Sequence, residues 1–194
     1  MGKYNDIVNE YSRSITQTWK NLSWNKVEKL FDDLLLAWEN RAKVFICGNG
    51  GSAANANHLA NDLMYGISPD DGKGLNVHAL TSNIAVNTCL ANDTGYENIF
   101  AKQLIALADE NDVLIAFSGS GNSPNIVEAI HQARTMKMKT HAVLGFDGGE
   151  CKKIAGNPIH LAINDMQVSE DFQMMIGHIL MKTLKGKNKL WNKE

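Results

Sequence analysis

The sequence predicts an α/β fold: a doubly wound, three-layer αβα sandwich with a five-stranded parallel sheet and additional N-terminal helices. Short apolar runs alternate along the chain with longer segments of helical periodicity, a pattern typical of parallel strands joined by right-handed helical crossovers. The run Asp112–Phe117 is almost wholly apolar, as expected for a strand with both faces covered by helices. Glycine-rich turns follow two of the predicted strands.

Two helices are expected before the first strand. The segment Tyr4–Asn21 has helical spacing, with one apolar face formed by Ile7, Tyr11, Ile15 and Trp19. A second helix is expected over Trp24–Glu39, with Ser23 as its N-cap. We expect a single domain over residues 1–194 and interpret residues 1–41 as a helical oligomerisation segment, with simple packing on its own domain as the alternative.

The remaining elements are expected in alternation, separated by loops such as Gly66–Gly74 and by a break at Asn92–Gly95. The five predicted strands are Val44–Cys47, Asn76–Thr81, Asp112–Phe117, Lys139–Leu144 and Pro158–Ile163. The predicted helices between and after them run from the glycine loop to about Tyr65, through Ile84–Leu90, over Tyr96–Ala108, from the serine loop to about Met136, and over Val168–Leu184.

The composition limits the kinds of molecule that the protein is expected to bind. The chain has 194 residues, 44% of them apolar, which is enough to bury the core of one α/β domain. Its 19 basic and 21 acidic residues are mixed along the chain, so we expect no nucleic-acid partner. No apolar run approaches transmembrane length and no segment resembles a signal peptide, so we expect no membrane partner.

The cysteines and the C-terminal stretch fit the same picture. Cys47, Cys89 and Cys151 are odd in number and lack CxxC spacing, so we interpret them as reduced, mostly buried thiols of a cytoplasmic protein. The lysine-rich stretch Lys182–Glu194 is expected to be a solvated tail.

The segment Val44–Asp62 organises the rest of the chain. A buried-strand run is followed by a turn with three glycines, Gly48, Gly50 and Gly51, and then by a small-residue helix. Such a layout can cradle an anion, because glycines let backbone N–H groups approach a phosphate and the helix N-terminus adds partial positive charge. An ordinary strand-to-helix turn is the alternative, since the segment is neither G-x-G-x-x-G nor a P-loop.

A second loop, Ser118–Ser123, offers three hydroxyls and two glycines between a buried strand and a helix. In an open parallel sheet, ligands bind outside the carboxyl ends of the strands, so both loops can contribute to one site. Neither loop contains lysine or arginine. A phosphate would therefore be held by hydroxyls, backbone N–H groups and helix dipoles.

Four stretches together resemble the phosphoheptose isomerase family, whose members have the sugar isomerase (SIS) fold: Cys47–Ala54, His58, Asn92–Phe100 and Ser118–Asn125. The resemblance covers roughly residues 43–184. It implies a homotetramer with sites at subunit interfaces, and an aldose–ketose isomerase that converts sedoheptulose 7-phosphate to a heptose 7-phosphate for surface polysaccharide. The substrate contacts it implies fall on Asn49, Gly50, Gly51, Ser52, Asn92, Asp93, Ser118, Gly119, Ser120, Ser123 and Glu170.

The chain departs from the family pattern at several implied site positions. Gly119 replaces the threonine of a Ser-Thr-Ser motif, which removes one hydroxyl. Asp62 stands where the family has glutamate, a side chain longer by about 1.5 Å. Glu170 stands where the family has glutamine, and Gln167 where it often has aspartate.

The implied chemistry needs a base at carbon and an acid at oxygen, because a proton moves between C1 and C2 through an enediol. A carboxylate and a histidine commonly fill these roles. The family uses the glutamate at position 62 and the histidine at position 178 in this way, so the catalytic candidates are Asp62, His178 and Glu170.

Zinc is a possible cofactor, and the resemblance implies the ligands His58, Asp62, Glu170 and His178. Glu170 and His178 are eight residues apart, which is a rise of about 12 Å along a helix. Either one of them binds the ion, or the side chains lean together, or different subunits contribute. The other histidines are expected to be structural or surface residues without recognisable partners: His78, His131, His141 and His160.

Three functions remain open at this point. A phosphosugar isomerase is favoured by His178 and by the carboxylate at position 62. A non-catalytic SIS-fold protein that binds a sugar phosphate or a protein partner is favoured by the altered acid–base set. An isomerase of another phosphorylated sugar is the third possibility.

Overall fold

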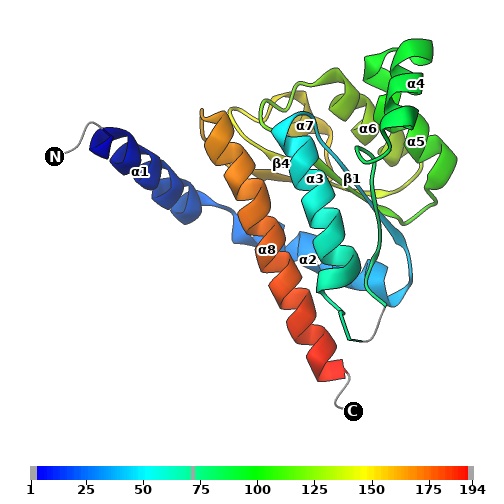
Figure 1. The fold of residues 1–194 in the computed structure, drawn as a ribbon, viewed down its shortest axis with the longest axis horizontal. Helices are drawn as coiled ribbons and strands as arrows, with labels where there is room; N and C mark the ends of the chain where they lie inside the picture. The colour runs from blue at the N-terminus through cyan, green and yellow to red at the C-terminus, as the bar shows by residue number, and fades with distance from the viewer. Residues whose placement is uncertain (1–3, 71–72, 192–194) are drawn as a thin grey trace.

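The computed structural model describes residues 4–70 and 73–191 and contains a five-stranded, wholly parallel sheet (Figure 1). The strand order is β2-β1-β3-β4-β5, which confirms the predicted doubly wound topology. The strands are β1 (Lys43–Cys47), β2 (Asn76–Ala79), β3 (Val113–Ser118), β4 (Lys139–Leu144) and β5 (Asn157–His160).

Helices cover both faces of the sheet. The order reverses between β1 and β3, which pair directly with Val44 opposite Val113. One face carries α2 (Trp24–Glu39), α3 (Gly51–Asn61) and α8 (Met166–Trp191). The other carries α5 (Ile99–Leu107), α6 (Pro124–Thr135) and α7 (Gly149–Ile154), with α4 (Ile84–Thr94) outside them.

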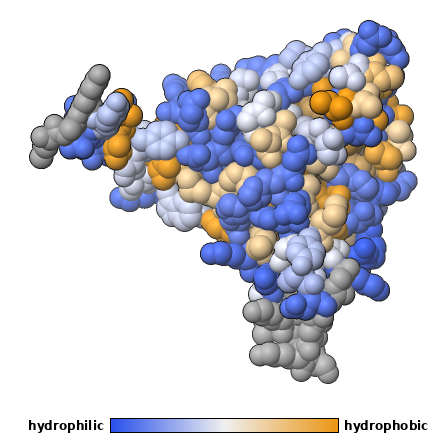
Figure 2. Space-filling view, in the orientation of Figure 1, coloured by the Kyte–Doolittle hydropathy of each residue, from blue (hydrophilic) through white to orange (hydrophobic). Residues whose placement is uncertain are grey.

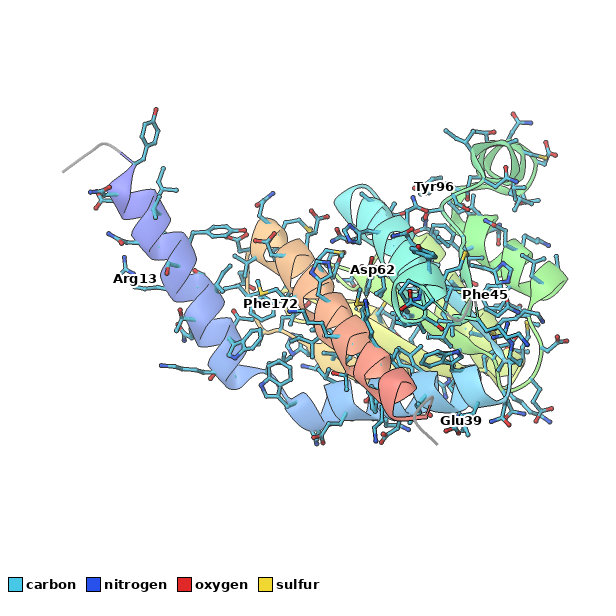
Figure 3. All side chains as sticks on the ribbon, turned by 60° about the horizontal axis from the view of Figure 1, so that its bottom comes forward. Arg13, Glu39, Phe45, Asp62, Tyr96 and Phe172 are labelled. Carbon is cyan, nitrogen blue, oxygen red and sulfur yellow. The ribbon has the colours of Figure 1, made fainter. Side chains whose placement is uncertain are left out.

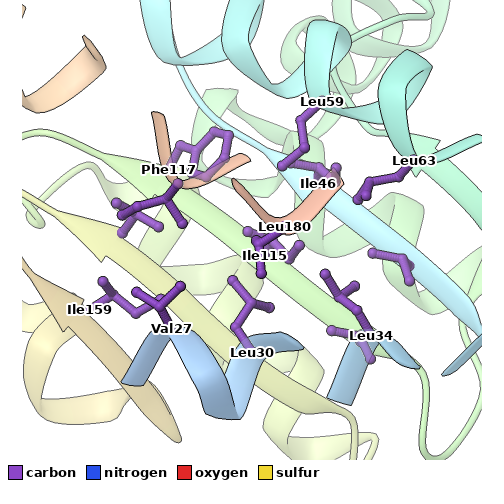
Figure 4. Close-up of a cluster of buried hydrophobic side chains, with 14 of the residues drawn as sticks. Val27, Leu30, Leu34, Ile46, Leu59, Leu63, Ile115, Phe117, Ile159 and Leu180 are labelled. Atoms are coloured by element: carbon purple, nitrogen blue, oxygen red, sulfur yellow. The ribbon is translucent and has the colours of Figure 1, made fainter. Parts of the chain in front are cut away.

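The larger core cluster lies between the sheet and the α2, α3 and α8 layer (Figure 4). Val27, Leu30 and Leu34 of α2 are buried at the spacing of one helix face. They meet alternate strand residues, because successive side chains of a strand point to opposite faces of the sheet. The strand residues on this face include Ile46, Ile115, Phe117 and Ile159.

The helix α1 (Asn5–Asn21) projects from the body of the molecule (Figure 1). Its apolar residues stay largely in solvent, with Ile7 65% and Val8 62% exposed, and Figure 2 shows apolar side chains on this projection. Tyr11 connects α1 to the body, since its Oη donates to Asp171 Oδ2 at 2.5 Å. This bond, with partial burial, raises the pKa of Tyr11 to about 12.

Several predicted boundaries are wrong. α4 runs through Asn92 and Asp93 to Thr94, where the sequence predicted a break. The short helix α7 was not predicted, and a 3-10 turn, η2 (Tyr96–Asn98), precedes α5. α8 continues as a helix to Trp191, so the predicted tail is helical up to that residue, while residues 192–194 lie outside the described part. Ser23 occupies the N-cap position of α2, but its side chain makes no capping hydrogen bond.

His141 has a partner that the sequence did not reveal. Its Nε2 lies 3.0 Å from Asp33 Oδ2, and its Nδ1 lies 2.9 Å from the side-chain nitrogen of Asn157. Lys139 Nζ also donates to Asp33, at 2.7 Å. The hydrogen bonds from His141 and Lys139 outweigh the effect of burial and hold the pKa of Asp33 well below its usual range. This cluster lies near the N-terminal end of β4, away from the loops described below.

Two cysteines are buried, as expected. Burial raises the pKa of the Cys47 and Cys151 thiols, whereas Cys89 is exposed, and none of the three is in a disulfide. Among residues 4–70 and 73–191, no helix has both the length and the apolar character needed to cross a membrane.

Candidate active site

The two predicted ligand loops follow adjacent strands at the point where the strand order reverses. β1 leads into Gly48–Gly50, and β3 leads into Gly119–Ser123. In this strand order, the crevice between β1 and β3 is where ligands bind. The structure therefore brings together the two loops that the sequence assigned to one site.

The β1–α3 loop presents the N-terminus of α3 to solvent. Gly50 has a φ of +56°, a conformation that disfavours residues with a side chain, and α3 begins at the next residue. Gly50 and Gly51 are exposed, so the unpaired N–H groups of the first helical turn face solvent. This geometry suits an anion.

Ser52 plays a different part from its neighbours. Its side chain is buried, and its Oγ accepts a hydrogen bond from Gln173 Nε2 of α8 at 3.0 Å. Asn55 donates to the oxygen of the same Gln173 side chain at 2.9 Å. The Ser52 side chain thus helps fix α3 against α8, a role that the sequence did not suggest.

The serine loop uses its hydroxyls unequally. Ser118 is buried, and its Oγ accepts from Gly121 N at 3.0 Å. Ser120 Oγ accepts from Asn122 N at 3.2 Å. Ser123 is the N-cap of α6, yet its side chain makes no capping bond, which leaves its hydroxyl available at a helix N-terminus. A side chain at Gly119 would overlap Met166 at the start of α8, so the missing hydroxyl is matched by a methionine that fills its space.

Asn92 and Asp93 lie exposed in the last turn of α4. Asn92 donates to Asp93 Oδ1 at 2.8 Å, and Cys89 Sγ lies 3.3 Å from Asp93 Oδ2. These two contacts, that of Asn92 first, lower the pKa of Asp93. The connection from this region to the glycine loop is made by Tyr96, whose Oη donates to Asn49 Oδ1 at 3.0 Å.

His58, Asp62 and His178 meet where α3 packs beside α8. The two histidine Nε2 atoms are 3.3 Å apart, and Asp62 Oδ2 lies 3.6 Å from that of His58 and 3.7 Å from that of His178. Figure 3 shows Asp62 between the ribbons of the two helices. The imidazoles are about half exposed, while the Asp62 side chain is 14% exposed.

Asp62 lies at a change in helix geometry on the side of α3 that packs against α8. The backbone changes from α-helix to a π-helical turn, η1 (Asp62–Gly66), at this residue. Such turns are rare and occur often at functional sites. Gly177 on α8 allows the close packing, because a Cβ there would lie 3.0 Å from Leu59 Cδ1.

The same three side chains could hold a metal ion, since one ligand atom from each lies within 4.8 Å of the others. Glu170 lies elsewhere. Its carboxylate packs on Gly51 at the start of α3, where a Cβ would lie 2.5 Å from Glu170 Oε1. Of the four predicted ligands, the structure brings together His58, Asp62 and His178 and places Glu170 beside the N-terminus of α3 instead.

Two further polar residues of the site were missed. Both lay inside recognised motifs, Asn125 in Ser118–Asn125 and Tyr96 in Asn92–Phe100, but nothing in their spacing marked them as site residues. Asn125 exchanges two side-chain hydrogen bonds with Asn49, both at 2.8 Å. Such long-range pairing depends on tertiary structure, because the two asparagines are 76 residues apart.

Comparisons with known proteins agree with this architecture. The model of the SIS domain family matches residues 8–145. The phosphoheptose isomerase of Helicobacter pylori is 40% identical over 147 residues, which is 76% of each chain. That of Clostridium acetobutylicum is 38% identical over 155 residues, covering 80% of this chain and 79% of its own.

Solved structures give the same result. The phosphoheptose isomerase from Neisseria gonorrhoeae superposes with a TM-score of 0.85 at 28% identity, covering 93% of this chain and 96% of its own. The phosphoheptose isomerase from Francisella tularensis superposes with a TM-score of 0.86 at 28% identity, covering 96% of this chain and 100% of its own. The matching family model, the identities and the structural superpositions make this chain a member of the SIS domain family, within the phosphoheptose isomerases.

Proposed function

We propose that this protein is an aldose–ketose isomerase that converts sedoheptulose 7-phosphate to D-glycero-D-manno-heptose 7-phosphate through an enediol. The observation that carries the proposal is the His58–Asp62–His178 cluster, which provides a carboxylate and two imidazoles between α3 and α8, while the N-terminus of the same α3 contributes to the proposed anion cradle. Relatives named phosphoheptose isomerase share more than a third of the aligned residues.

The phosphate is bound between the N-termini of α3 and α6. Backbone N–H groups at Gly50 and Gly51 and the hydroxyls of Ser120 and Ser123 act as donors, and both helix dipoles favour the negative charge. The free hydroxyl of Ser123 supports this role most directly. Asn92 and Asp93 are assigned to bind the sugar hydroxyls. The hydrogen bond from Tyr96 to Asn49 connects the region of these two residues to the cradle.

Proton transfer is assigned to Asp62 and His178. Asp62 takes the proton from one of C1 and C2 and returns it to the other, while His178 donates a proton to the substrate carbonyl oxygen and then takes one from the neighbouring hydroxyl, which becomes the new carbonyl. Asp62 is the favoured base because it lies within 3.7 Å of both imidazoles. The carboxylate of Glu170 on α8 lies against Gly51, at the N-terminal end of α3, away from the His58–Asp62–His178 cluster. There it lies near the proposed phosphate site and not near the reacting carbons.

Zinc fits the donor set. Ligand atoms bound tetrahedrally at 2.0–2.1 Å are about 3.3–3.4 Å apart, close to the separations of 3.3 to 3.7 Å among His58, Asp62 and His178. Bound there, zinc would polarise the sugar carbonyl or a hydroxyl. We assign these three residues as its protein ligands. A histidine nitrogen that binds zinc cannot donate a proton, so with zinc bound the ion, and not His178 Nε2, would polarise the substrate oxygens.

The protein is proposed to work as a cytoplasmic homotetramer, with residues 1–41 contributing to the subunit contacts. The exposed apolar face of α1 supports this assignment, because a projecting helix of this kind is expected to be covered.

The decisive experiment incubates the purified protein with a panel of ketose phosphates in deuterium oxide and follows C1 and C2 by NMR. Deuterium incorporation and aldose formation from sedoheptulose 7-phosphate, faster than from other ketose phosphates, are expected. Exchange with another sugar phosphate would reassign the substrate, and no exchange with any of them would favour a binding protein.

A further inference from the structure

The side chain of Asn49 is almost fully engaged by its own protein. Its Oδ1 accepts from Asn125 Nδ2 at 2.8 Å and from Tyr96 Oη at 3.0 Å. Its Nδ2 donates to Asn125 Oδ1 at 2.8 Å. An amide oxygen has two acceptor sites and an amide nitrogen two hydrogens. Only one hydrogen of Asn49 is therefore left for a ligand.

The partners of Asn49 come from two other parts of the fold. Asn125 is the second residue of α6 and is only 1% exposed. Tyr96 opens the turn η2, two residues after the end of α4, and is 58% exposed. Asn49 itself precedes Gly50, the N-cap of α3. The three side chains thus connect the two helix N-termini to each other and to the Asn92–Asp93 region.

We infer that Asn125 and Tyr96 are positioning residues for anion binding, which act through Asn49 and do not touch the phosphate. The amide pair sets the α3 N-terminus against the α6 N-terminus, so that N–H groups of one and the Ser123 hydroxyl of the other converge on the same anion. Tyr96 holds the same amide from the exposed side. The ligand class, a phosphate ester, rests on the proposed function.

This arrangement predicts a specific energetic pattern. If Tyr96 acts only through Asn49, its hydroxyl contributes nothing once the Asn49 amide has been removed. If Tyr96 contacts the ligand itself, the losses from the two substitutions are independent and add. A double-mutant cycle separates these cases, because it measures coupling between the two side chains.

The test measures binding of inorganic phosphate by calorimetry to the wild-type full chain and to Tyr96→Phe, Asn49→Ala and the double variant. Tyr96→Phe removes one neutral hydrogen bond and should raise the phosphate Kd about three- to tenfold. In the Asn49→Ala background, the same change should alter the Kd less than about twofold. Tyr4→Phe, which removes a hydroxyl from an exposed tyrosine outside the site, is the matched control and should leave the Kd unchanged.

Asn125 is tested in the same assay. Asn125→Ala removes both hydrogen bonds between Asn125 and the Asn49 amide and should raise the Kd at least tenfold. Because the buried variant can fail to fold, the Tyr96 cycle carries the decision. In turnover, Tyr96→Phe should raise KM while kcat stays within about twofold, since the interaction is expected to stabilise substrate and transition state equally.

The outcomes separate this inference from the proposed activity. Additive effects of Tyr96→Phe and Asn49→Ala would overturn the positioning role even in an active isomerase. Coupled effects on phosphate binding in a protein that isomerises no sugar would support the positioning role and refute the activity. Absence of any phosphate binding to the wild type would overturn the inference outright.

Discussion

Replacement of Asp62 tests the proposed mechanism most directly, because two carboxylates compete for the role of base. Asp62 Oδ2 lies 3.6 and 3.7 Å from the two imidazoles. Glu170 lies eight residues before His178 on α8, a rise of about 12 Å, and its carboxylate rests on Gly51. Glu170 therefore cannot take over proton transfer at the cluster within one chain.

The expected magnitude follows from this geometry. A positioned general base contributes about 10²–10⁴-fold, which corresponds to about 3–5 kcal/mol of transition-state stabilisation. Asp62→Asn should therefore lower kcat/KM for sedoheptulose 7-phosphate by at least a hundredfold. Glu170→Gln should keep kcat/KM within about threefold, and the double variant should match Asp62→Asn.

Deuterium exchange at C1 and C2, followed by NMR, measures these values independently of product release. Zinc content is measured on each variant, so that a loss of metal is distinguished from a loss of the base; Asp62→Glu, which keeps a carboxylate, provides the comparison. Near wild-type exchange in Asp62→Asn together with its loss in Glu170→Gln would show that Glu170 is the base. Wild-type turnover in Asp62→Asn, Glu170→Gln and His178→Ala alike would refute the mechanism.

Four further predictions follow from the structure. Ser120→Ala and Ser123→Ala should each weaken phosphate binding roughly tenfold, because a hydrogen bond to a charged group contributes about 1.5–3 kcal/mol; unchanged calorimetric affinity in both would remove these serines from the site. A chain lacking residues 1–22 should form a smaller oligomer or aggregate in light scattering, and an unchanged mass would show that α1 is not an assembly element. Removal of metal with a chelator should abolish exchange, and zinc should restore it, whereas full activity of a metal-free preparation would exclude a zinc requirement. Asp33→Asn should lower the free energy of unfolding by about 1.5–3 kcal/mol at neutral pH. Since the folded-state pKa of Asp33 is depressed, this difference should persist above the unfolded value of about 3.9 and shrink as the pH falls below it; equal urea midpoints at pH 7 would contradict the assigned contacts.

Much of the fold could be predicted from sequence because strands and helices here have clear periodicity. The buried run of β3 and the apolar face of α2 are local patterns, and both elements formed where expected. The end of α4 was missed for a physical reason. Asn92, Asp93 and Thr94 favour turns, but Thr94 bonds back to Leu90 O within the helix, and Gly95, with a φ of +95°, supplies the stop one residue later.

The site divides along the same line. The glycine and serine loops could be located from sequence, because the glycines and hydroxyl side chains that mark each loop lie close together in the chain. Contacts between distant segments could not. The pairing of Asn49 with Asn125, of Ser52 with Gln173 and of Asp33 with His141 each depends on how helices pack on the sheet.

Glu170 shows why position in a family pattern is a weaker guide than geometry. From sequence, a new carboxylate at a position implied to bind both substrate and metal could equally replace Asp62 as base or add a metal ligand. In the structure it rests against Gly51, at the N-terminus of α3, where a helix dipole favours negative charge. Only glycine at position 51 leaves room for it. The same dipole attracts a substrate phosphate, so the negative charge of Glu170 and that of the phosphate are drawn to the same helix N-terminus. We therefore expect Glu170 to affect the affinity for phosphate and not the proton-transfer step.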